Sequence, residues 1–235
     1  MAGGVRGHGL NRSAAPAGGR AWLALAALLA FGAVAVAAAA GMAADPAALR
    51  HGLDWQPGRE AAEPWRLWTA AWVHLSPAHL ALNVAAALGI GALGRIARRP
   101  PADALAWGAA WPLTQWLLAA PPWARIAASL SHYAGLSGVL HAGVVVLGLG
   151  LAWPAPGPAD ATADARLRTR ERRIGLALLA GVLAKLLLEA PWNIALRPDA
   201  LLGIAVAPLA HACGVAAGAA AWAAVSAVTQ ATRRQ

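Results

Sequence analysis

The stretch AWLALAALLAFGAVAVAAAAGM, Ala21 to Met42, contains no side chain with a charge, a hydroxyl or a carboxamide. Coiled as an α-helix it is about 33 Å long, enough to cross the ~30 Å hydrocarbon core of a bilayer. It therefore predicts a membrane-spanning helix near the start of the chain.

This stretch has a second interpretation. Arg20 precedes it and small residues follow it, which is also typical of a secretory signal that is cleaved after export. Its apolar run is, however, longer than the roughly 7–15 residues of such signals. We therefore favour a retained helix.

The rest of the chain has the same character. Of 235 residues, 59% are apolar and 12% are charged, and the mean hydropathy is +0.53. This charged share is about half that of soluble domains. Ala and Leu dominate and Phe and Tyr occur once each, which favours helix over strand. No short alternating segments suggest a β-barrel, so the composition predicts an all-α membrane protein.

Two other classes of protein are disfavoured. The net charge of +9 would suit nucleic-acid binding only if the basic residues shared one soluble face, whereas they lie between apolar segments. The single cysteine, Cys213, allows no internal disulfide and no cysteine-based metal site. The sequence has no P-loop and no GxGxxG, and we expect no cofactor and no metal.

Six apolar stretches have the length of a membrane span. They are residues 21–42, 74–96, 102–120, 133–153, 174–196 and 201–228. The third is the weakest, because Pro112 and Gln115 interrupt it. An even number of spans predicts a helix bundle whose N-terminus and C-terminus lie on the same side of the membrane.

Basic residues predict which side that is, because short cytoplasmic loops carry an excess of Lys and Arg. With the N-terminus inside, thirteen of the nineteen basic residues are cytoplasmic, five lie outside and Lys185 lies within a span. We expect one membrane domain, residues 21–228, between cytoplasmic tails 1–20 and 229–235. Pro154–Arg173 is expected to be a flexible cytoplasmic linker.

Polar side chains within the predicted spans are candidate functional residues, because such groups are costly in a bilayer and face the bundle interior. These candidates are His74, His79, Asn83, Ser137, His141, Lys185, Glu189 and His211.

His79 and Asn83 are four residues apart and share one helix face. Hydrogen bonding between helices is one interpretation of this pair. A zinc site is another, but no third ligand has a convincing spacing. His74 lies at the start of the same span.

The segment GLSGVLHAG surrounds Ser137 with Gly135 and Gly138. One interpretation is that these small residues have no catalytic role and serve to let two helices approach closely. His141 lies one turn after Ser137, but a base on the same helix seldom has good geometry toward the hydroxyl. We expect His141 to support the site.

His211 begins a stripe of small residues that continues with Gly214 and Gly218. If this helix packs against the helix of Ser137, the imidazole comes within hydrogen-bond reach of the hydroxyl, which is the arrangement of an activated nucleophile. Lys185 and Glu189, four residues apart, fit a structural ion pair better than a catalytic one.

Four motifs occur in order along the chain: Trp65-Arg66, then His74-x4-His79-x3-Asn83, then Gly135-x-Ser137-Gly138, then Ala210-His211-x2-Gly214-x3-Gly218. This pattern, from Trp65 to Ala221, resembles the rhomboid family of intramembrane serine proteases.

The resemblance implies a six-helix bundle with a water-filled cavity open to the outer side, and a Ser–His dyad. It implies Ser137 as the nucleophile, His211 as the general base, and His79 and Asn83 as oxyanion-stabilising residues. His74 and the Trp65-Arg66 pair correspond to structural positions in and near the first external loop.

The extended YAGLSGVLHAG and the KLLLE of the fifth span resemble the rhombosortase subgroup, whereas typical rhomboids carry Tyr where His141 stands. The resemblance implies a multi-pass protein of a bacterial inner membrane. It would cut Gly-Gly-type C-terminal transmembrane tails of exported proteins.

Three other interpretations remain. One is a general rhomboid protease with other single-span substrates, and another is a rhomboid-fold binding or quality-control protein without protease activity. A small transporter would be expected to show broken helices or an internal repeat, and neither is evident.

Overall fold

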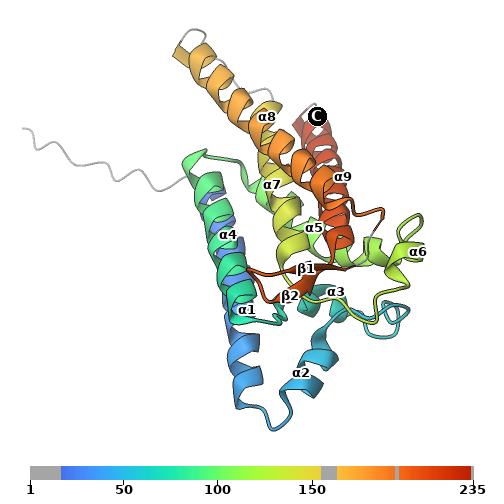
Figure 1. The fold of residues 1–235 in the computed structure, drawn as a ribbon. Coiled ribbons are helices and arrows are strands. Elements are labelled where there is room, and N and C mark those ends of the chain that lie inside the picture. Colours follow the sequence, from blue (N-terminus) through green and yellow to red (C-terminus); the bar gives the residue numbers. More distant parts are fainter. Residues whose placement is uncertain (1–16, 155–162, 194–195, 234–235) are drawn as a thin grey trace, which may run out of the picture.

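The protein is described by a computed structural model that covers residues 17–154, 163–193 and 196–233, and within these ranges the chain is mostly helical (Figure 1). The elements in chain order are α1 (Ala17–Met42), α2 (Pro46–Leu53), α3 (Arg66–Thr69), η1 (Ala70–Trp72), α4 (Pro77–Ile96), α5 (Pro101–Ala119), α6 (Ala124–Ala127), α7 (Ser137–Ala152), α8 (Ala163–Glu189), β1 (Arg197–Asp199), β2 (Ile204–Val206) and α9 (Pro208–Arg233).

Among the described residues, three helices are long and apolar enough to cross a membrane, namely Gly18–Met42, Pro77–Ile96 and Pro208–Thr232. The 16-residue α7 is equally apolar in character but shorter. Large apolar side chains such as Phe31 and Ile96 are exposed, with 73% and 76% of their surface free. Such exposure is expected for side chains in contact with lipid rather than water.

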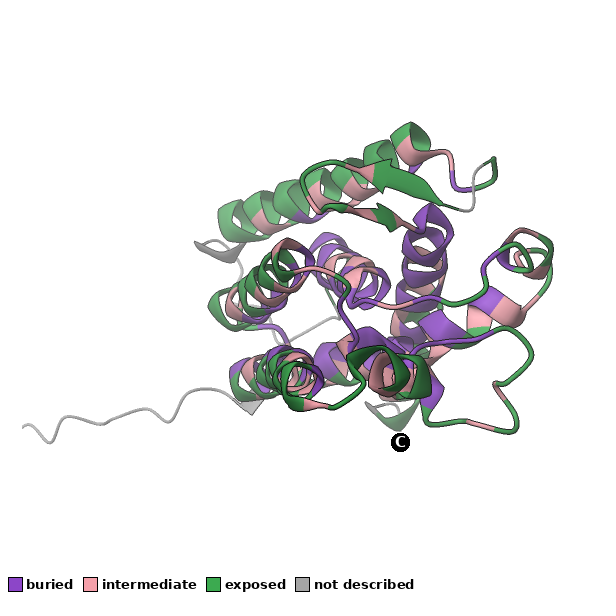
Figure 2. Cartoon of the chain, turned by 60° about the horizontal axis from the view of Figure 1, so that its bottom comes forward, coloured by how far each residue is buried: buried purple, intermediate pink, exposed green. Residues whose placement is uncertain are grey.

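Helix α7 lies at the centre of the bundle, and α4, α5, α8 and α9 pack around it, while α1 packs against α4. Indole rings fill much of the core; Trp22 and Trp107 are fully buried, and their rings lie 5.5 Å apart. Figure 2 shows the difference in burial, with α8 and the strands largely exposed and the inner helices largely buried.

Strands β1 and β2 form an antiparallel hairpin in which Arg197 pairs with Val206 and Asp199 with Ile204. The turn between them contains Gly203 at φ +65°, a conformation that glycine adopts without strain. The chain is mostly helical, as predicted, but the last predicted span does not begin as a helix at residue 201. The apolar run after residue 200 is part of a hairpin and a turn before α9 begins.

Several helix bounds differ from the predicted spans because local signals override hydropathy. Helix α4 begins at Pro77, since the Ser76 hydroxyl accepts from the N–H of His79 and caps the helix. His74 therefore precedes the helix. Helix α8 ends at Glu189, where Ala190 takes φ +46° and a proline follows, so that the fifth span does not reach residue 196.

The predicted linker Pro154–Arg173 is wrong for its second half, because α8 begins at Ala163. Its residues 155–162 lie outside the described part of the chain, as do residues 1–16 and 234–235 of the predicted tails. The Arg and Leu residues of this segment are good helix formers, which explains the longer helix.

Candidate active site

Ser137 and His211 lie side by side at the start of two adjacent helices. Ser137 is the first residue of α7, and His211 lies in the first turn of α9. The Ser137 Oγ and the His211 Nε2 are 3.0 Å apart, within hydrogen-bond distance. The contact expected between these two residues is present.

Small residues bring the two backbones together at this point. A Cβ on Gly138 would lie 2.7 Å from the carbonyl oxygen of Ala210, and one on Gly214 would overlap the carbonyl oxygen of Gly138. One turn further along, a Cβ on Gly218 would lie 2.6 Å from the carbonyl oxygen of Ala142. Only glycine fits at these three positions without moving a helix.

The segment before Ser137 is extended, although the fourth span was predicted to begin at residue 133. Gly135 has φ +127°, which L side chains rarely adopt, and its N–H donates to the carbonyl oxygen of Ala70. The Tyr133 hydroxyl donates to the carbonyl oxygen of Gly135 at 3.0 Å, and Tyr133 pairs with Trp55 through the backbone. These contacts make Ser137 the first helical residue.

Glu189 contacts the other nitrogen of the same imidazole. The His211 Nδ1 lies 2.7 Å from the Glu189 Oε2, and the Lys185 Nζ lies 2.5 Å from the Glu189 Oε1. Because a carboxylate only accepts, Nδ1 carries the proton and Nε2 is free to accept from the Ser137 hydroxyl. The predicted Lys185–Glu189 ion pair is present. The same carboxylate also accepts a hydrogen bond from His211, which lies on another helix.

His141 stacks on His211, with ring centroids 4.2 Å apart and planes inclined by 19°. Its Nδ1 lies 2.7 Å from the backbone carbonyl oxygen of Ser137 and donates a hydrogen bond to it. The ring therefore supports the imidazole from the side instead of contacting the serine hydroxyl. This is the position in which a supporting residue was expected.

His79, Asn83 and His74 form a second polar group beside the serine. The Asn83 amide nitrogen donates to the His74 Nε2 at 3.0 Å, while the His74 Nδ1 donates to the carbonyl oxygen of Trp72 at 3.1 Å. Burial lowers the pKa of His74 below its ordinary value, which favours this neutral form. The rings of His74 and His79 are 4.7 Å apart, and the His79 ring lies against Gly135.

With the exception of His74, these polar residues line one cavity of about 680 Å³. Its lining residues come from α4, α7 and α8, with contributions from the hairpin and from His211 of α9. The polar side chains that line it include Ser137, His79, Asn83, Glu189 and His211. The other lining residues are mostly Leu, Val, Ala and Gly, so the cavity suits an apolar chain.

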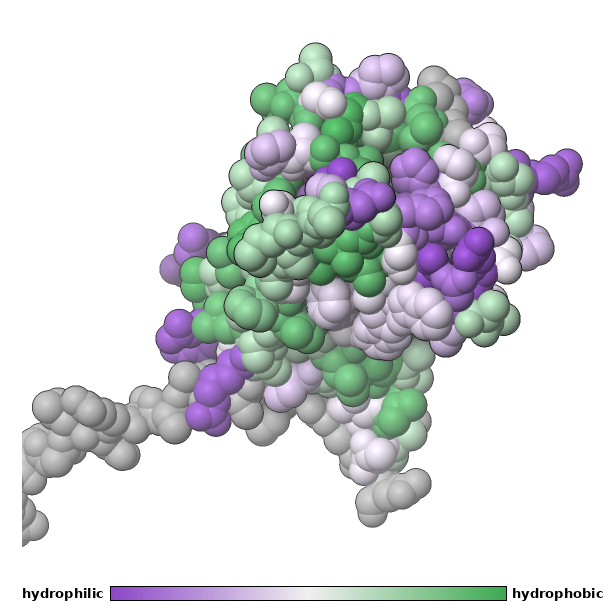
Figure 3. Space-filling model, turned by 90° about the horizontal axis from the view of Figure 1, so that it is seen from below, coloured by the Kyte–Doolittle hydropathy of each residue, from purple (hydrophilic) through white to green (hydrophobic). Residues whose placement is uncertain are grey.

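Trp65 and Arg66 lie outside this cavity. The buried Arg66 guanidinium donates to the backbone carbonyls of His51 and Asp54 and to the Glu63 carboxylate. This hydrogen bond from Arg66 holds the pKa of Glu63 below its usual value. Arg66 thus fixes the segment between α2 and α3. Seen from below, the largest hydrophilic patch lies on the right of the view, and hydrophobic residues cover much of the rest of this face (Figure 3).

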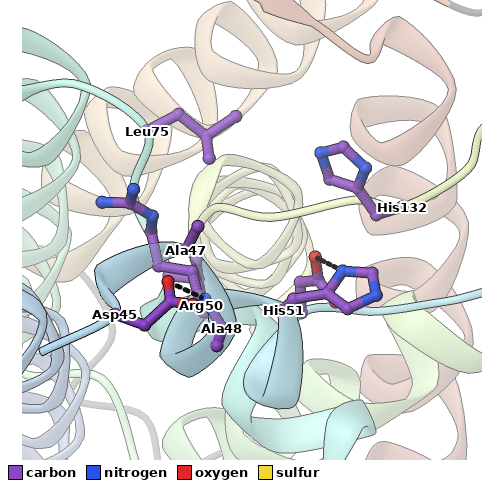
Figure 4. Close-up of a pocket in the computed structure, with 9 residues that line it drawn as sticks. Asp45, Ala47, Ala48, Arg50, His51, Leu75 and His132 are labelled. Atoms are coloured by element: carbon purple, nitrogen blue, oxygen red, sulfur yellow. Dashed lines mark hydrogen bonds and ion pairs between the residues drawn. The ribbon is translucent and has the colours of Figure 1, made fainter. Parts of the chain in front are cut away.

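A second hollow of about 410 Å³ lies beside α2, where His51 and His132 face each other across the opening (Figure 4). It is wide and lacks a nucleophile. Within the described residues, no group of three or more His, Cys, Asp or Glu side chains is arranged to hold a metal ion.

Two contributors to the site were not predicted. The first is the hairpin, whose Leu202 carbonyl accepts from the Ser76 hydroxyl at 2.5 Å and whose Asp199 lines the cavity. The second is the backbone N–H of Ser137, since the first turn of a helix leaves such donors without intrahelical partners. The Ser76-Pro77 pair is a helix-start signal that was available in the sequence.

No protein-family model matches the chain, and no curated protein matches it either.

Proposed function

We propose that this protein is a rhomboid-type intramembrane serine endopeptidase of a bacterial inner membrane. Its proposed substrates are exported proteins with Gly-rich C-terminal transmembrane tails. The observation that carries the proposal is the 3.0 Å contact between the Ser137 Oγ and the His211 Nε2, placed at the end of a largely apolar cavity between helices.

The proposal includes six spans, α1, α4, α5, α7, α8 and α9, with both termini in the cytoplasm. The arrangement of basic residues supports this orientation. Arg99 lies beside the start of α1 and the end of α7, because Gly18 and Gly150 pack against it. Helix α8 carries its arginines near its start, and α9 ends at Arg233. All of these lie at the end remote from Ser137, as the positive-inside rule requires.

The short length of α7 supports a position of Ser137 below the membrane surface in the proposed topology. Its 16 residues span about 24 Å, which is less than the ~30 Å hydrocarbon core. If the last turn of α7 lies at the cytoplasmic surface, a helix of this length begins before the outer surface is reached. Water would reach Ser137 through the cavity that this residue lines.

In the proposed mechanism, the His211 Nε2 takes the proton of the Ser137 hydroxyl while the oxygen bonds to the substrate carbonyl carbon. The carbonyl π electrons move to oxygen, which becomes an oxyanion. His211 then returns the proton to the leaving amine as the C–N bond breaks. Water attacks the resulting ester in the same way and frees Ser137.

The oxyanion needs donors that are already in position, since the loss of one costs about 100 to 1000-fold in rate. The backbone N–H of Ser137 and the side chains of His79 and Asn83 line the relevant end of the cavity. Asn83 has a second amide proton besides the one given to His74. We assign these three donors to the oxyanion.

The cavity has the shape and chemistry for an extended apolar segment. Gly89 on α4 and Gly181 on α8 line opposite walls, and open space surrounds the position of a Cβ on each. A substrate helix must unwind before its backbone reaches Ser137. Glycines ease this, because each is about 1 kcal/mol less favourable in a helix than Ala. This supports the choice of Gly-rich tails.

The test uses purified full-length protein in lipid vesicles and a reporter that carries a Gly-Gly-type transmembrane tail. The wild type should cleave the reporter and react with a fluorophosphonate probe at Ser137, and Ser137→Ala should do neither while still inserting into the membrane. Equal cleavage by both proteins would rule out the mechanism. Cleavage of other single-span reporters, but not of this one, would rule out the proposed substrate class. A wild type that neither cleaves nor reacts would favour a binding protein or a transporter.

A further inference from the structure

The carboxylate of Glu189 is the third member of a chain of hydrogen bonds that starts at the serine. Ser137 comes from α7, His211 from α9 and Glu189 from the last position of α8. The two contacts of the imidazole are 3.0 Å on the serine side and 2.7 Å on the glutamate side. We infer that Glu189 is a positioning residue for His211, so that the site works as a triad; this inference depends on the proposed protease function.

Burial separates this contact from an ordinary surface ion pair. The side chains of His211 and Glu189 are 5% and 11% exposed, whereas that of Lys185 is 49% exposed. A pair with such an exposed lysine contributes little to stability. A carboxylate held against a buried imidazole in poor contact with water interacts far more strongly. The contact of Glu189 with His211 is therefore the stronger of its two contacts.

The carboxylate performs two tasks for the base. It fixes the proton on Nδ1, which leaves the Nε2 lone pair directed at the Ser137 hydroxyl. It also stabilises the imidazolium that forms when Nε2 takes the serine proton, without taking a proton itself. Lys185 occupies the second carboxylate oxygen and limits the rotation of the group.

The end of α8 is built so that Glu189 stays in place. Ala190 closes the helix through its N–H, which donates to the carbonyl oxygen of Leu186, and the Arg197 guanidinium donates to the carbonyl oxygen of Leu188 at 3.0 Å. Hairpin residues thus hold the helix end that carries the acid. The acid reaches the base from a helix other than those of the serine and the histidine.

The experiment measures kcat and KM for the tail-bearing reporter in the full-length protein, together with Tm. Glu189→Gln keeps the shape of the side chain and removes its charge. It should lower kcat by about 100-fold or more, with KM changed less than about threefold, since the equivalent change in a known triad costs about 10⁴-fold. Glu189→Asp keeps the charge and should recover at least about tenfold over Glu189→Gln.

Two controls separate positioning from a structural role. Glu171→Gln makes the same chemical change on α8, some 18 residues away, and should leave kcat and Tm at wild-type values. Lys185→Met removes the ion pair but keeps the carboxylate on His211, and should lower kcat less than about tenfold, as expected for an exposed pair.

A Glu189→Gln variant within about threefold of the wild-type kcat would overturn the inference, because a triad acid costs far more. So would equal losses in Glu189→Gln and Lys185→Met with equal drops in Tm, which would indicate a structural ion pair only. If Ser137→Ala cleaves as well as the wild type, the proposed function itself fails. If Ser137→Ala is inactive and Glu189→Gln is not, the inference alone fails.

Discussion

Helix α7 packs against two of its neighbours, α8 and α9, in different ways. Against α9 the backbones touch along Gly138, Gly214 and Gly218, beside Ser137 and His211. Against α8 a close backbone contact lies far from the site, where a Cβ on Gly148 would lie 3.2 Å from the carbonyl oxygen of Gly175. Nearer the site, a cavity separates α7 from α8.

This difference divides the site into a fixed part and an adjustable part. Ser137 and His211 keep their distance because two backbones cannot approach further or slide without a clash. Glu189 and the outer wall of the cavity depend on polar contacts at the end of α8. In the proposed protease, this division would keep Ser137 and His211 in place while a bulky substrate enters beside them.

The largest expected effect comes from the contact between α7 and α9. Gly214→Val should push α9 away from Gly138 and separate the base from the nucleophile. We expect cleavage of the tail-bearing reporter to fall by about 100-fold or more, the loss expected for a displacement of about 1 Å. Stability should fall by about 1–3 kcal/mol, as for other overpacked cores.

Initial rates and chemical denaturation would measure the two effects of Gly214→Val. Gly41→Val is the control, because nothing lies within 4 Å of a Cβ at Gly41. Wild-type activity in Gly214→Val would mean that the close contact does not position the pair.

A smaller effect is expected at the wall formed by α8. Nothing lies within 4 Å of a Cβ at Gly181, so Gly181→Trp should fill part of the cavity and slow reporter cleavage about tenfold, which corresponds to ~1.4 kcal/mol. Labelling of Ser137 by a small fluorophosphonate should stay unchanged. Leu176→Trp, at an exposed position of α8 outside the cavity, should leave both rates unchanged. A parallel loss of labelling in Gly181→Trp would show that the whole site had moved.

The ring of His141, which stacks on His211, should contribute less to the cleavage rate than the open cavity at Gly181. His141→Ala removes a ring contact with His211 of the kind worth about 0.5–1.5 kcal/mol, so that kcat should fall about fivefold. His141→Phe retains a ring for stacking and should recover most of this loss. If His141→Phe is as slow as His141→Ala, the hydrogen bond to the Ser137 carbonyl matters more than the stack.

The smallest effect is expected at the hairpin. Arg197→Ala removes the donor to the Leu188 carbonyl, an exposed hydrogen bond worth about 0.5 kcal/mol, and kcat should fall about twofold. The matched change Arg59→Ala, on the exposed segment between α2 and α3, should have no effect on kcat. A loss of tenfold or more in Arg197→Ala would mean that the hairpin controls the position of Glu189 more strongly than this bond suggests.

Much of the fixed part could be predicted from the sequence. The glycines near Ser137 and His211 indicated a close contact between two helices, and this contact is what brings the pair together. The contact of Glu189 with His211 could not be predicted, because the nearby Lys185 already offered a local partner. It connects two helices across a hairpin, and hydropathy gave no sign of that hairpin in the apolar segment after residue 200.

Helix bounds could have been predicted better from capping residues than from apolar runs. Pro77 and Pro208 each begin a helix, and the predicted spans began before both. The positive φ of Gly135 could not be predicted from sequence, since its N–H donates to the carbonyl of Ala70, which is distant along the chain. The start of α8 was missed because a run of arginines resembles a linker when no partner helix is known.

If α8 spans the bilayer as proposed, its short apolar part has a consequence for the surrounding lipid. Between Arg173 and Lys185 lie only eleven residues, or about 16 Å of helix, roughly half of a ~30 Å hydrocarbon core. Such hydrophobic mismatch is relieved by local thinning of the bilayer and by charged side chains that extend toward the headgroups. The bilayer would then be thinnest beside α8, which lines the cavity. A substrate helix that approaches at this point would have less of its length covered by lipid acyl chains.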